Sequence, residues 1–133
     1  MVEIHAYSKA ASGGKQLSAH FKVREFACGD GSDAVLVAPR LVMVLETIRA
    51  HFDAPVVIHS AYRTPQYNAK VNGAAHSQHC YGMAADIVVK GQTPAAVAAF
   101  ARTLMPDWGG VGVYVKKGFT HIDVREKRSD WTG

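Results

Sequence analysis

Three residues of types that bind metal ions stand in or beside apolar segments of the sequence. His79 lies in a polar, glycine-containing stretch, Asp86 begins an apolar run, and His121 lies within another apolar run. Polar groups in such runs are costly to bury unless a partner or a metal ion satisfies them. Zinc takes imidazole and carboxylate ligands, and a catalytic zinc keeps three protein ligands and one open position for water. The three residues are therefore candidate ligands of one catalytic zinc ion.

Asp123 follows His121 by two positions in a predicted strand, so the two side chains leave the same face while Ile122 and Val124 point to the core. Three roles are open for these residues. Asp123 is either a general base that takes a proton from metal-bound water, or an acceptor that orients a histidine ligand. In a third alignment Asp123 is itself the ligand and His121 is the catalytic histidine.

Other chemically capable residues carry weaker signals. His76 lies close to His79, but the residues between them have loop character, so it is expected to line a cleft rather than to bind metal. Cys28 and Cys80 are the only cysteines and are interpreted as unpaired thiols, because two cysteines are too few for a disulfide framework. Trp108 and Trp131 are interpreted as packing residues, although a tryptophan near a cleft also stacks well on a sugar.

The elements that would position these residues follow from hydrophobic periodicity and capping signals. Helices are predicted from Pro39 through His51, from Thr64-Pro65 to about Asn72-Gly73, and from Thr93-Pro94 until Pro106 stops it. Strands are predicted at 55–59, 85–89, 111–115 and 119–124, with the last two joined by a hairpin at 116–118. The expected fold is a single α+β domain whose small, largely antiparallel sheet is flanked by helices and carries the zinc site on one face.

Composition supports one folded domain. The chain has 133 residues, of which 48% are hydrophobic and 20% charged. The stretch 12–14 separates an expected amino-terminal arm, residues 1–14, from the domain at 15–133. No apolar run approaches the ~20 residues of a membrane span, and no signal peptide is recognisable. The basic residues, net +4, form neither a run nor a helix face, so neither nucleic acid nor membrane insertion is expected.

Several blocks of sequence resemble the signature of a known peptidase family. They are Ser60-Ala61-Tyr62-Arg63-Thr64-Pro65 with Asn68, Gly73-Ala74, and the run from Ser77 to Ile87, which reads SQHCYGMAADI. Further blocks at 17–26, 109–114 and 119–125 extend the match to about residues 17–125. The pattern resembles the zinc D-alanyl-D-alanine carboxypeptidases and L-alanyl-D-glutamate endopeptidases of bacterial cell walls, in particular their small, often phage-encoded branch, whose fold is shared with hedgehog signalling domains.

The resemblance implies roles for individual residues. His79, Asp86 and His121 would be the zinc ligands. Arg63 would face the active site, where its guanidinium holds a substrate carboxylate or polarises the scissile carbonyl. Ser77 would contact substrate backbone, and Tyr114 is expected to reach the cleft from a neighbouring strand. The substrate would be a peptidoglycan stem peptide, cut at the D-Ala-D-Ala end or at the L-Ala-D-Glu bond.

One position departs from the family pattern. Many relatives carry a catalytic acidic residue three positions before the last zinc histidine, and this sequence has Gly118 there. Asp123 is the expected substitute as base. The alternative is a zinc-containing but inactive cell-wall binding module. The expected protein is a monomer that acts on the wall, in the periplasm or outside the cell, and that stays in the cytoplasm until release if it is a phage endolysin.

Overall fold

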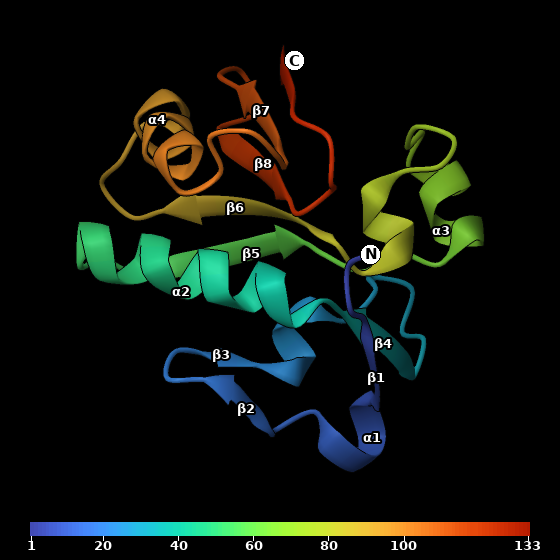
Figure 1. The fold of residues 1–133 in the computed structure, drawn as a ribbon. Coiled ribbons are helices and arrows are strands. Elements are labelled where there is room, and N and C mark those ends of the chain that lie inside the picture. Colours follow the sequence, from blue (N-terminus) through green and yellow to red (C-terminus); the bar gives the residue numbers. More distant parts are fainter.

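A five-stranded sheet runs through the centre of the structure, a computed structural model that describes residues 1–133 (Figure 1). Its strands, in spatial order, are β5 (Val56–Ser60), β6 (Ala84–Val89), β8 (Phe119–Asp123), β7 (Gly110–Tyr114) and β9 (Ser129–Thr132). All neighbours are antiparallel except β7 and β9, which are parallel. The predicted α+β domain with a largely antiparallel sheet is therefore confirmed.

Helices α2 (Pro39–Phe52) and α4 (Pro94–Leu104) cover one face of this sheet. Each begins with proline, whose fixed φ suits the first helical turn. Thr93 caps α4 by accepting a hydrogen bond from the Ala96 amide. The apolar stripes of the helices meet the sheet in one buried core that includes Leu41, Leu45, Ile48, Val97, Ala101, Ile87 and Ile122. This packing leaves the opposite face of the sheet for polar side chains.

Two short helical segments lie over the carboxyl end of β5 and the start of β6. Helix α3 (Pro65–Lys70) is capped by Thr64, whose hydroxyl accepts from the Tyr67 amide. The 3-10 helix η2 (Gln78–Tyr81) ends at Gly82, immediately before β6. Figure 1 shows both segments on one side of the sheet, away from α4. They bring the loop at 71–77 to the polar face.

The amino-terminal residues form small elements that were not anticipated. Strand β1 (His5–Ser8) pairs with β4 (Ala34–Val37), and β2 (Gln16–Ser18) pairs with β3 (Phe21–Lys22). Helix α1 (Lys9–Ser12) and the 3-10 helix η1 (Val23–Phe26) complete this region. The expected arm at 1–14 thus contributes one strand to a small sheet. Its division from the domain at 15–133 stays a prediction.

The longest helix, α2, has 14 residues. None of the helices is both long enough and apolar enough to cross a bilayer.

Candidate metal centre

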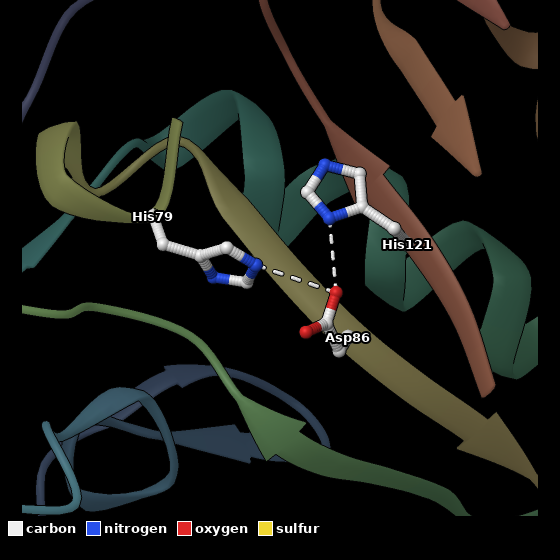
Figure 2. A group of neighbouring side chains, drawn as sticks. All are labelled: His79, Asp86 and His121. Carbon is white, nitrogen blue, oxygen red and sulfur yellow. Dashed lines mark hydrogen bonds and ion pairs between the residues drawn. The ribbon is translucent and has the colours of Figure 1, made fainter. Parts of the chain in front are cut away.

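His79, Asp86 and His121 converge on the polar face of the sheet, as Figure 2 shows. His79 comes from η2, Asp86 from β6 and His121 from β8, and all three side chains are buried. Asp86 Oδ1 lies 3.3 Å from His79 Nε2 and 2.9 Å from His121 Nδ1. One potential ligand atom from each residue lies within 4.8 Å of the other two. The structure therefore brings together the three residues predicted from the sequence.

The second nitrogen of each imidazole has a hydrogen-bond acceptor of its own. His79 Nδ1 lies 2.7 Å from the carbonyl oxygen of Ala61, and His121 Nε2 lies 2.8 Å from Asp123 Oδ2. These nitrogens must therefore carry the ring protons, because a carbonyl and a carboxylate only accept. His79 Nε2 and His121 Nδ1 face Asp86, and a metal ion would displace any proton that they share with this carboxylate and bind their lone pairs. Two imidazole nitrogens and one carboxylate oxygen are a donor set that fits one catalytic zinc ion.

The backbone around His79 is fixed by local structure. Ser77 caps η2, because its hydroxyl accepts a hydrogen bond of 3.3 Å from the His79 amide. Gly82 ends the segment at φ 73, and a Cβ there would lie 2.6 Å from the backbone of Leu36. The Arg63 amide donates to the His79 carbonyl at 3.1 Å. These contacts hold the histidine at the edge of the sheet. The predicted contact of Ser77 with substrate remains a prediction.

Strand register sets the two ligands of the sheet side by side. Asp86 on β6 is directly opposite His121 on β8, and His121 is opposite Gly112 on β7. Gly112 is in turn opposite Trp131 on β9. Directly paired residues share a face, so this row crosses four strands on the polar side of the sheet. Because Gly112 has no side chain, the Trp131 ring approaches His121, with ring centroids 4.9 Å apart.

Asp123 lies beneath the centre with no exposed surface. Its Oδ1 accepts from the Gly110 amide at 3.0 Å and from Arg125 Nε at 2.8 Å, and its Oδ2 accepts from Arg125 Nη2 at 2.7 Å and from His121. Asp123 therefore accepts a hydrogen bond from His121 Nε2, the ring nitrogen that faces away from Asp86. These contacts favour the role of an acceptor that orients His121. They give no support to the alignment in which Asp123 is a ligand, because Asp123 lies outside the convergent group.

The carboxylates of the centre are held ionised by their partners. Burial alone would raise the pKa of Asp86, but hydrogen bonds from His121 and His79 hold that pKa well below its usual range. Burial acts in the same way on Asp123, and hydrogen bonds from Arg125 and His121 keep its pKa low. For His121, burial lowers the pKa, but the hydrogen bonds with Asp123 and Asp86 outweigh it and the pKa is raised.

Arg63 reaches the centre through the second oxygen of Asp86. Its Nη2 lies 3.4 Å from Asp86 Oδ2, while its Nε donates to Ser60 Oγ at 3.1 Å and its Nη1 to Asn68 Oδ1 at 3.3 Å. Asn68 is buried and donates to the carbonyl of Ala74 at 2.9 Å. Arg63 therefore lies at the site, and its predicted contact with substrate stays a prediction. Asn68, noted in the sequence only as part of a motif, orients the guanidinium together with Ser60.

The centre lies in a cleft of about 410 Å³. Around the ligand group the lining carries three cationic side chains, one further imidazole and three large aromatic rings, namely Arg63, Lys117, Arg125, His76, Tyr114, Phe119 and Trp131. Asp86 is the only carboxylate among the lining residues. The cleft therefore suits a substrate that carries negative charge. Tyr114 and His76 are among the residues that line it, and the predicted role of Tyr114 in substrate binding stays a prediction.

The sequence interpretation gave Arg125 no role at the cleft and treated Trp131 mainly as a packing residue, but both line the cleft. Trp131 packs, as expected, but it packs against His121 in the cleft wall, with the Arg125 guanidinium 5.3 Å from its ring centre. The alternating glycines Gly110 and Gly112 were a usable signal. A Cβ at Gly110 would collide with the Asp123 carboxylate, and one at Gly112 would lie 2.6 Å from Trp131. Such glycines indicate that large side chains from neighbouring strands cross over them.

A buried histidine, aspartate and histidine with converging lone pairs, in a cleft on a mostly antiparallel sheet, are the site of a zinc metallopeptidase. The family model of peptidase M15 matches residues 13–123. The chain therefore belongs to the peptidase M15 family, whose zinc-dependent members hydrolyse peptides of peptidoglycan. Among curated proteins no match to the chain was found.

Proposed function

We propose that this protein cleaves peptidoglycan stem peptides, at the D-Ala-D-Ala end or at the L-Ala-D-Glu bond, in cell lysis or wall remodelling. The observation that carries the proposal is the convergence of His79 Nε2, Asp86 Oδ1 and His121 Nδ1 in a cleft. Both bonds lie next to carboxylates, which match the cationic lining. The net charge of +4 also favours approach to an anionic wall.

Each residue of the centre has a proposed task. His79, Asp86 and His121 would hold one zinc ion, which, when bound, lowers the pKa of a bound water toward neutrality and offers a Lewis acid to the scissile carbonyl. Ala61 and Asp123 fix the two imidazole rings through their ring protons. Arg63, held by Ser60 and Asn68, adds positive charge beside the reacting carbonyl or binds a substrate carboxylate.

The position at which relatives carry an acidic residue lies in the turn between β7 and β8. Gly118 has φ 78, its amide donates to the Tyr114 carbonyl at 2.8 Å, and a Cβ built there would have no neighbour within 4 Å. The left-handed conformation favours glycine, and no side chain at this position takes the proton of the attacking water. That proton needs another acceptor.

Two side chains are candidates for this acceptor. Asp123 was predicted from the sequence, but its oxygens are engaged by Arg125, Gly110 and His121. His76 is the one imidazole of the lining outside the ligand group, and its side chain is exposed to the cleft. An imidazole takes up a proton near neutral pH, which suits a general base. We therefore assign proton transfer to His76 and the orientation of His121 to Asp123.

Substrate contacts would come from the walls of the cleft. Ser77 and Tyr114 are proposed to hold the peptide backbone, and Lys117 and Arg125 to attract its carboxylates. The protein is expected to act as a monomer on the wall, in the periplasm or outside the cell. Release of a phage endolysin from the cytoplasm would be one route of delivery.

The test is mass spectrometry of muramyl stem peptides after incubation with the zinc-loaded protein, with a chelator-treated sample as the control. Loss of a terminal D-Ala would identify a carboxypeptidase, and cleavage after L-Ala an endopeptidase. If zinc-loaded protein binds these peptides but cleaves none, the proposal fails in favour of an inactive wall-binding module, for which Gly118 in place of an acidic residue would be the reason.

A further inference from the structure

A hydrogen bond joins two aromatic residues in the cleft wall. Trp131 Nε1 lies 2.9 Å from the hydroxyl oxygen of Tyr114. An indole N–H only donates, so the tyrosine oxygen is the acceptor in this bond. Tyr114 makes no other side-chain hydrogen bond in the structure. Its own hydroxyl proton is therefore directed away from Trp131 and has no acceptor in the protein.

The Tyr114 ring cannot turn easily to find another partner. One face stacks on Phe119, with ring centroids 4.4 Å apart and planes inclined by 14°. Gly133 packs so closely against the ring that a Cβ there would collide with it. Tyr114 lines the same cleft as His121 and Asp86. A ring fixed in this way presents its free O–H donor to whatever occupies the cleft.

Trp131 is fixed as firmly as the tyrosine. Strand β9 pairs with β7 so that Trp131 lies opposite Gly112, and the missing side chain of Gly112 gives room for the indole. The Arg125 guanidinium lies 5.3 Å from the indole ring centre, and the His121 ring lies 4.9 Å from it. The indole N–H can thus hold the tyrosine oxygen in one orientation. Trp131 lies beyond residues 13–123, which the family model matches.

We propose that the Tyr114 hydroxyl donates a hydrogen bond to a backbone carbonyl oxygen of the bound peptide, and that Trp131 is the positioning residue that makes this hydroxyl a donor toward the cleft. This inference rests on the proposed hydrolysis of stem peptides and adds the hydroxyl through which Tyr114 holds the peptide and the residue that positions this hydroxyl. Without the indole N–H, the hydroxyl is free to rotate and the donor is no longer preorganised.

The variants Tyr114→Phe, Trp131→Phe and the double variant test this arrangement. Tyr114→Phe keeps the ring and removes only the hydroxyl, whereas Trp131→Phe removes the indole N–H together with part of the ring, which makes an equal truncation at the second tryptophan the necessary control. Each single variant is expected to lower kcat/KM on a stem peptide about 3- to 30-fold, mainly through KM, since the hydrogen bond contributes to substrate binding. The double variant is expected to equal Tyr114→Phe alone, because Trp131 acts through Tyr114. Trp108→Phe, outside the cleft, is the matched control and should leave kcat/KM unchanged.

A second measurement follows the hydrogen bond itself in the zinc-loaded protein. The two indole N–H signals in a nitrogen-proton NMR spectrum belong to Trp108 and Trp131. Tyr114→Phe should shift the Trp131 signal and increase its hydrogen exchange while the Trp108 signal stays in place. The zinc affinity of all variants should match that of the wild type, which separates this role from damage to His121.

The outcomes separate this inference from the proposed function. If the wild type cleaves stem peptides and Tyr114→Phe has the same kcat/KM, the inference is wrong and the proposed function stands. If the losses in kcat/KM of the two single variants add up in the double variant, Trp131 does not act through Tyr114 and its positioning role is wrong. If the wild type cleaves none of the peptides, isothermal titration calorimetry compares the binding of the same peptides to the wild type and to the two single variants. Weaker binding by both single variants supports the inference, and unchanged or absent binding overturns it.

Discussion

Asp86 and His121 lie directly opposite each other on the antiparallel strands β6 and β8, and Asp86 Oδ1 is 2.9 Å from His121 Nδ1. The register of these two strands therefore places two of the three candidate metal ligands side by side. A slip of either strand by one residue would turn its ligand side chain into the core face. The apolar neighbours Ile87 and Ile122, which are fully buried, oppose that slip. Core packing and metal binding thus depend on the same strand pairing.

Removal of zinc should abolish hydrolysis and lower stability. Zinc that binds only the folded chain, at about 100 times its Kd, adds about 2.7 kcal/mol to the free energy of unfolding. We expect chelation to lower Tm by several degrees and readdition of zinc to restore both Tm and activity. Differential scanning calorimetry of the wild type and of His121→Ala checks this. A zinc-dependent Tm shift that persists in His121→Ala would contradict the assigned centre.

Asp123→Asn separates the two roles considered for Asp123. If Asp123 orients His121, the variant should bind zinc about 10- to 100-fold more weakly, because the acceptor for the His121 ring proton is weakened. A general base, by contrast, could be lost with zinc affinity unchanged. Competition with a chromophoric chelator measures the affinity, and peptide hydrolysis at saturating zinc measures turnover. Unchanged affinity with turnover lost would return the role of base to Asp123.

His76→Gln tests the proposed proton acceptor. Glutamine keeps a polar side chain of similar size but takes up no proton near neutral pH, so we expect kcat to fall about 100- to 10,000-fold with zinc still bound. His59→Gln is the matched control, because His59 is exposed on β5 and does not line the cleft. Steady-state kinetics on the best stem peptide gives the comparison. Equal kcat values in the two variants would exclude His76 as the base.

Gly112→Ala should disturb the cleft wall. The new Cβ would lie 2.6 Å from the Trp131 ring, so the indole or β9 must move. We expect a loss of about 1 to 3 kcal/mol in the free energy of unfolding, as for overpacking in a core, together with a lower kcat/KM. Gly14→Ala is the control, since the nearest atom to a Cβ there is 3.9 Å away. Urea unfolding of both variants tests this expectation, and equal stabilities would refute it.

Glu46 gives the folded state a pH dependence remote from the metal centre. Burial would raise its pKa, but hydrogen bonds from Ser18 and His20 lower it below the usual value of 4.5. A carboxyl whose pKa is lower in the folded chain stabilises that chain above the unfolded pKa and loses this contribution as pH falls through the folded pKa. Glu46→Gln should therefore destabilise by about 1 kcal/mol at pH 7 and by less near pH 3. Urea unfolding at both pH values measures it, and an equal loss at both would contradict the linkage.

The local patterns of the sequence predicted most of the elements that surround the site. Helices α2, α3 and α4 begin where the Pro39, Thr64-Pro65 and Thr93-Pro94 signals placed them. Strands β6 and β8 were predicted from apolar runs, and the polar residues in those runs gave Asp86 and His121. These predictions succeeded because capping, periodicity and the cost of burying a polar group act between near neighbours in sequence.

The amino-acid sequence by itself determined the α+β class and the three residues of the metal centre, since each is marked by its own local context. Only the tertiary structure decided the parallel pairing of β9 with β7, which brings Trp131 over Gly112 to His121 and Tyr114. It also decided that Asp123 faces the outer nitrogen of His121 and the Arg125 guanidinium. The physical reason is that these relations depend on which strands become neighbours and on how close their side chains come, and no short stretch of sequence contains that information.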